Sequence, residues 1–117
     1  MRSETLIKTF NAPAAVAGYR LITFATGINE VEAADAVSDP IIGVTTSIGS
    51  QDNGRCDVVV AGITEAEIGG TITRGDVLTS DASGRAVTSA AGTDRVVGIA
   101  MADAVAGDIA AILIAQG

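Results

Sequence analysis

The segments Asp39-Pro40-Ile41-Ile42-Gly43-Val44 and Asp94-Arg95-Val96-Val97-Gly98-Ile99 share one pattern and lie about 55 residues apart. β-Branched residues dominate both segments, as is typical of strands, where branching at Cβ fits the pleated surface. Each segment has a glycine inside its strand pattern, which indicates a bulge or the close approach of another backbone segment. The repeated pattern predicts two related β units that share one core around a pseudo-twofold axis.

The similarity extends to both sides of these two segments. At the same separation, residues 58–62 align with residues 113–117. With a slip of one residue, Leu21-Ile22 aligns with Val77-Leu78, and Val31 aligns with Val87.

These alignments predict the domain organisation. The two repeats are expected at about residues 15–62 and 70–117, within a single β domain of residues 12–117. Residues 1–11 fall outside the duplicated part and are predicted to form an N-terminal arm.

Short strand patterns recur along the whole chain between turns of Gly, Asn, Asp and Pro. No long segment keeps helical periodicity, and only residues 32–37 could form a single helical turn. Asn53-Gly54 indicates a hairpin, because both residues tolerate the positive φ of a type I′ turn. The predicted fold class is therefore all-β, a small β-sandwich or barrel of two related β units with an N-terminal arm. The predicted strands are 5–10, 19–25, 30–33, 41–48, 56–61, 63–68, 76–79, 85–88, 96–102 and 109–115.

Composition excludes several classes of partner. The 117 residues suffice for one domain, and the apolar content of 48% with only 3% aromatic residues consists mainly of small and β-branched side chains. Such residues do not build the aromatic walls of many small-molecule pockets. The net charge of −7, with only seven Lys and Arg residues, argues against binding to nucleic acid or to an anionic membrane. The acidic balance instead favours basic or neutral protein partners.

Residues that commonly carry chemistry are scarce. The chain has no His, and its one thiol, Cys56, is predicted to be a small buried hydrophobe. The pairs Glu30 with Glu32 and Glu65 with Glu67 each share one face of a strand, where they could hold a hard cation or simply face solvent. Arg74-Gly75-Asp76 spells an integrin-binding tripeptide, but it is predicted to be a turn into a strand. We therefore predict no enzyme activity, cofactor or metal; the alternative is a small-molecule- or metal-binding β-barrel, including an enzyme, that uses the acidic pairs.

Two features favour interaction with other proteins. The stretch 109–115 has no polar residue on either face, so one face needs cover beyond the domain core, either within the monomer or from a neighbouring subunit. The arm has a β pattern, and it either pairs with its own sheet edge or adds a strand to a neighbour. The predicted contact residues are Arg2, Leu6, Ile7, Lys8, Phe10, Ile112 and Leu113.

A set of short motifs in the second half resembles the capsid decoration (cement) proteins of tailed bacteriophages, a family formerly described only as a domain of unknown function. These motifs are the strand start 75–78, the turn 81–86, the pattern Val-Val-Gly-Ile-Ala at 96–100, and 104–108 before the final apolar strand. The resemblance covers residues 70–117 most closely and extends to 15–62.

The resemblance implies a structural virion protein. Such proteins are β-sandwich or barrel modules, usually homotrimers, which bind the major capsid protein on the outer face of the head and stabilise the expanded shell. The resemblance implies no active site. The chain lacks an apolar signal core behind its N-terminus, and its longest apolar run is too short to cross a bilayer. We therefore expect synthesis in the host cytoplasm and assembly onto the virion surface.

Overall fold

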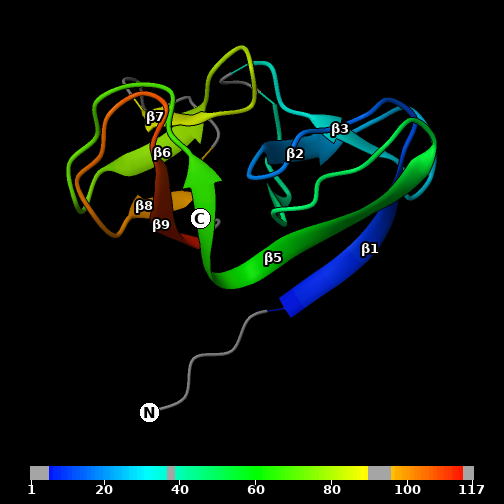
Figure 1. The fold of residues 1–117 in the computed structure, drawn as a ribbon, viewed down its shortest axis with the longest axis horizontal. Helices are drawn as coiled ribbons and strands as arrows, with labels where there is room; N and C mark the ends of the chain where they lie inside the picture. Colours follow the sequence, from blue (N-terminus) through cyan, green and yellow to red (C-terminus); the bar gives the residue numbers. More distant parts are fainter. Residues whose placement is uncertain (1–5, 37–38, 90–95, 115–117) are drawn as a thin grey trace.

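The computed structural model describes residues 6–36, 39–89 and 96–114, which form one sheet in which every ladder between strands is antiparallel. The strand order is β3-β2-β4-β5-β9-β8-β6-β7, and β1 pairs with β5. In Figure 1 the long β5 crosses from the part that contains β1, β2 and β3 to the part that contains β6 to β9. No described residue is helical. The strands are β1 (Leu6–Ala12), β2 (Leu21–Phe24), β3 (Val31–Ala33), β4 (Gly43–Thr45), β5 (Gly54–Glu67), β6 (Val77–Ser80), β7 (Ala86–Thr88), β8 (Gly98–Ala100) and β9 (Ile109–Ile114).

The all-β prediction is confirmed, and each predicted strand overlaps an observed one. Two predicted strands, 56–61 and 63–68, are one continuous strand, β5, which passes through Gly62 at a φ of 100°. Asn53-Gly54 does not form a two-residue hairpin, because residues 46–53 separate β4 from β5. Within the Asn53-Gly54 pair only Asn53 has a positive φ (54°), and Gly54 begins β5. No described helix is long and apolar enough to span a membrane.

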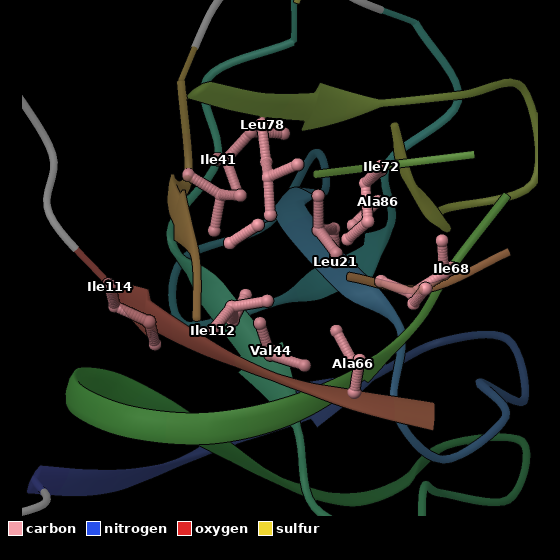
Figure 2. Close-up of a cluster of buried hydrophobic side chains, with 14 of the residues drawn as sticks. Leu21, Ile41, Val44, Ala66, Ile68, Ile72, Leu78, Ala86, Ile112 and Ile114 are labelled. Atoms are coloured by element: carbon pink, nitrogen blue, oxygen red, sulfur yellow. The ribbon is translucent and has the colours of Figure 1, made fainter. Parts of the chain in front are cut away.

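The sheet curls so that its two ends meet. The Leu21 N–H at the start of β2 donates to the carbonyl of Gly84, in the turn between β6 and β7, at 2.7 Å. The Glu67 N–H at the end of β5 donates to the Tyr19 carbonyl at 2.9 Å. The main core fills the concave side, with side chains from both halves of the chain (Figure 2). Its members include Leu21, Ile41, Val44, Ala66, Ile68, Ile72, Leu78, Ala86, Ile112 and Ile114.

A second, smaller core lies on the other face of the first half. Leu21 and Val59 point into the main core, whereas their chain neighbours Ile22 and Val58 belong to the second core, as the alternation of a strand requires. The first half is therefore covered on both faces. The second core contains Ala12, Val16, Ile22, Val31, Cys56 and Val58, and Phe10, Ala33, Ile42 and Val60 pack against it.

The pairing scheme of the first half occurs again in the second. Ile22 of β2 lies opposite Gly43 of β4, and Leu78 of β6 lies opposite Gly98 of β8. These registers agree with the predicted alignments of the glycines and of Leu21-Ile22 with Val77-Leu78. Positive φ values also recur about 55 residues apart, in the pairs Tyr19 and Gly75, Asn29 and Gly84, and Asn53 and Gly107.

In the second unit, the later part of β5 occupies the position beside β9 that β1 occupies beside the earlier part of β5 in the first unit. Ile7 of β1 lies opposite Val59, and Ile63 of β5 lies opposite Leu113 of β9. Val59 lies opposite Val44 as Leu113 lies opposite Ile99, so Val59 is the equivalent of Leu113. The predicted alignment matched residue 58 with Leu113, one residue away. On this register we place the two proposed units at residues 6–61 and 62–114, with β1 inside the first unit.

Candidate interaction surface

β1 contains four of the predicted contact residues, and it pairs with β5 of its own chain from Leu6 to Ala12. Leu6 and Ile7 are 56% and 51% exposed, and Lys8 is also exposed. Phe10 is half-buried against the second core. Arg2 lies outside the described residues. Of the two arrangements predicted for the arm, pairing with its own sheet or adding a strand to a neighbour, the structure has the first.

β9 alternates between the core and the surface. Ile112 is fully buried in the main core, and Leu113 is half-buried on the opposite face. Ile112 therefore has no surface to offer a partner, which corrects its prediction as a contact residue. Leu113 alone of this pair remains a candidate contact.

Leu113 is one member of a row of apolar side chains on the outer face of the second half. Val77 lies opposite Ile99, Ile99 opposite Leu113, and Leu113 opposite Ile63, so the row crosses β6, β8, β9 and β5. Val77 and Ile63 are 46% and 42% exposed, and the two middle members are half-buried. We call these four residues the outer row. Only Leu113 was predicted from the sequence, although strand alternation could have indicated Ile63 and Ile99 as well.

Three of the four equivalent residues in the first half are covered. Leu21, Val44 and Val59 correspond in register to Val77, Ile99 and Leu113, and all three are buried in the main core. The second half of the chain supplies much of that cover. Ile7, the equivalent of Ile63, is 51% exposed, so the fold covers three of these four positions in the first unit and leaves the outer row accessible in the second.

A polar groove lies along β1. It is lined by Lys8, Thr9, Phe10, Asn11, Asn29 and Arg55. Its two cations have no carboxylate partner among the described residues, whereas Arg20 pairs with Glu67 at 2.8 Å and Arg85 with Asp81 at 3.1 Å. Arg55 and Asn29 were not predicted as site residues, because only the fold brings them beside β1.

The acidic pairs do not gather into a metal site. Glu65 is exposed, whereas Glu67 binds Arg20, so the two carboxylates have different surroundings. Glu30 accepts the Gly27 N–H at 2.9 Å. Within residues 6–36, 39–89 and 96–114, no three His, Cys, Asp or Glu side chains are grouped so that they could hold a metal ion.

The other two motifs have structural roles. Cys56 is fully buried in the second core, and burial raises the pKa of its thiol. Arg74-Gly75-Asp76 turns the chain into β6, as predicted: Gly75 has a φ of 95°, and the Asp76 carboxylate accepts the Thr73 N–H at 2.9 Å. The Gly75 N–H donates to the Ala100 carbonyl at 2.8 Å, which anchors this turn to β8.

The fold has a match among solved structures, and the sequence matches a family model. No curated protein matches the chain significantly. Among solved structures, the crystal structure of the head fiber gp8.5 N base in bacteriophage phi29 has the same fold, with a TM-score of 0.76 and 22% sequence identity over 96% of this chain and 95% of that chain. A model of the phage cement protein family matches residues 1–115. The chain therefore belongs to the phage cement protein family, whose members are structural proteins of the virion capsid surface and not enzymes.

Proposed function

We propose that this protein binds the outer face of a phage capsid as a homo-oligomer, most simply a homotrimer, and stabilises the expanded shell. The observation that carries the proposal is the outer row, a strip of apolar side chains on a strongly acidic domain. Apolar side chains from four adjacent strands form one contiguous strip, and such strips are typical of surfaces that bind another protein. Cover from a second copy would remove this strip from water.

The β1 side of the molecule supplies a second surface. Leu6, Ile7, Lys8 and Phe10 lie on β1, and Arg2 precedes it in the sequence. These five residues are the proposed contacts with the major capsid protein, and Leu113 is the proposed contact between copies. These two sets of contacts on one small domain would allow each copy to contact the shell and its neighbour, and so to connect adjacent capsid subunits.

Sedimentation with expanded heads that lack this protein tests the proposal. We expect saturable binding, and we expect decorated heads to release their DNA at a higher temperature than bare heads, because a ligand that binds only the intact shell stabilises it. Unexpanded heads serve as the control and should bind much less. Absence of saturable binding, or equal DNA release from bare and decorated heads, would contradict the proposal.

A further inference from the structure

β1 pairs with β5 along one edge, and along its other edge, called the open edge here, only Asn11 pairs with a described residue. The Asn11 N–H donates to the Asn29 carbonyl at 2.8 Å, so the main chain of Asn11 faces away from β5. Main-chain groups of an antiparallel strand alternate in direction, so Thr9 and Ile7 face the same way as Asn11, whereas Lys8 and Phe10 bond to β5. The carbonyl of Asp57, opposite Thr9, accepts the Thr46 N–H at 3.2 Å and thus also points away from β1, which agrees with this assignment.

No described residue pairs with the open edge at Ile7 or Thr9. Two N–H donors and two carbonyl acceptors there thus have no partner among the described residues. Native sheets usually protect such edges with charges, prolines, bulges or a covering segment. Here the described protection is limited to Lys8 and a bulge between Leu6 and Ile7, and both of these apolar residues are more than half exposed.

The groove beside this edge has a positive lining on an acidic protein. Lys8 and Arg55 contribute the charge, and neither pairs with a carboxylate of the described chain. The nearby Asp57 carboxylate accepts the Thr9 O–H at 2.8 Å, and the Glu30 carboxylate accepts the Gly27 N–H. A segment that enters the groove is thus favoured if it has carboxylate side chains.

We propose that the open edge of β1 accepts an extended acidic segment of the capsid shell as an added strand. This inference rests on the proposed function and specifies the chemistry of its shell contact. Main-chain hydrogen bonds to Ile7 and Thr9 give affinity, and contacts of carboxylates with Lys8 and Arg55 give specificity. β1 stays in its own sheet and acts as the template, so the arm does not leave the domain to pair elsewhere.

Replacing one edge N–H tests the added strand. Thr9→Pro removes the N–H that points to the open edge, and an edge strand tolerates proline on this side. Thr9→Val is the matched control, because it removes the same hydroxyl but keeps the N–H. We expect Thr9→Pro to weaken binding to expanded heads by about tenfold or more relative to Thr9→Val, with similar melting temperatures. Equal head binding by the two variants would overturn the inference.

Amide hydrogen exchange of the unaltered protein gives a second readout that does not depend on how Thr9→Pro folds. The Ile7 and Thr9 amides should exchange fast in the free protein and slowly on heads, and an absence of protection on heads would overturn the inference.

Lys8→Glu combined with Arg55→Glu should weaken binding to expanded heads by about tenfold or more, and unchanged binding would exclude an acidic segment. If the unaltered protein itself does not bind heads, the proposed function fails instead.

Discussion

Gly43 lies where β4 and β5 approach each other closely, as the glycine in the strand pattern predicted. A Cβ at this position would overlap the Val59 carbonyl and lie 2.9 Å from Cγ1 of Val58. Both obstacles belong to β5 and are fixed by the ladder and the core. We expect Gly43→Ala to lower the free energy of unfolding by about 2 kcal/mol, measured by urea denaturation, because the strands must separate to admit the methyl group.

Gly70→Ala is the matched control for Gly43→Ala. The nearest atom to a Cβ at Gly70 is Cγ1 of Val87 at 3.9 Å, an ordinary contact. The control should change the unfolding free energy by no more than about 0.5 kcal/mol. Equal effects at the two glycines would mean that crowding by β5 does not explain the residue at position 43.

Asp35 and Asp39 form a surface pair of like charges. The Asp39 carboxylate accepts the Asp35 N–H at 2.9 Å. The side-chain hydrogen bond between the two carboxyl groups, and then the charge of Asp39, raise the pKa of Asp35 above its ordinary 3.8. The folded state therefore holds this proton more tightly than the unfolded state. The resulting stabilisation is fully present below pH 3.8 and is lost as the pH rises through the folded pKa.

Asp35→Asn removes this titration and the repulsion at neutral pH. The variant should melt at a slightly higher temperature than the unaltered protein at pH 7, and the difference should disappear or reverse below pH 3.8. Thermal melts at both pH values measure the effect. Asp108→Asn, at a carboxylate that accepts the Val105 N–H instead, serves as the control. A variant with no gain at neutral pH would contradict the assigned repulsion.

At the scale of elements, β1 contributes to stability through its ladder and through Phe10. Deleting residues 2–10 would remove most of the β1–β5 pairing and uncover Cys56 and Val58 in the second core. We expect a loss of about 2 kcal/mol or more, seen as a lower melting temperature, because a half-buried aromatic side chain and several main-chain hydrogen bonds are lost. Deleting residues 2–5 keeps the whole described ladder and should leave the melting temperature nearly unchanged. A melting temperature unaffected by the longer deletion would mean that β1 does not stabilise the domain.

The strands themselves could be predicted from the sequence because their signals are local. β-Branched runs and turn residues indicated every strand position, since the pleat and the turns act on neighbouring residues. β5 was divided wrongly because Gly62 reads as a break, yet its positive φ is accommodated within a strand that bridges both halves of the sheet. The close approach at Gly43 was also predictable, because a glycine inside a strand usually marks a bulge or a neighbouring backbone that leaves no room for a side chain.

The candidate surfaces could be predicted only in part, because they depend on which faces the fold covers. An apolar run such as 109–114 does not indicate which alternate residues are buried, so Ile112 and Leu113 could not be distinguished until β9 was placed against β5 and β8. Likewise, Arg55 and Asn29 line the β1 groove through contacts between segments far apart in sequence. Long-range pairing of this kind has no local signature.

At the scale of the whole molecule, the two proposed units differ chiefly in what covers them. The first unit has cores on both faces of its sheet, and the second has a core on one face and the outer row on the other. Because the strand pairing recurs while this cover does not, the outer row is the place where the monomer departs from the proposed repeat. A second copy that packs on the outer row would complete the pattern that the first unit completes within the chain.

Oligomerisation through this row can be separated from folding by two neighbouring residues of β9. Leu113→Glu places a charge in the outer row, where the free monomer tolerates it because the side chain is only half-buried. In an interface between copies the same charge would be buried without a partner, so we expect soluble, folded monomers by light scattering at concentrations where the unaltered protein is oligomeric.

Ile112→Glu, at the neighbouring residue, places the charge in the main core and should unfold or aggregate the chain. Glu65→Gln, on the same face of β5, is the control for a surface change and should keep the oligomer. If Leu113→Glu assembles like the unaltered protein, or the unaltered protein is monomeric at every concentration and forms no clusters on heads, then the outer row does not join copies of this chain.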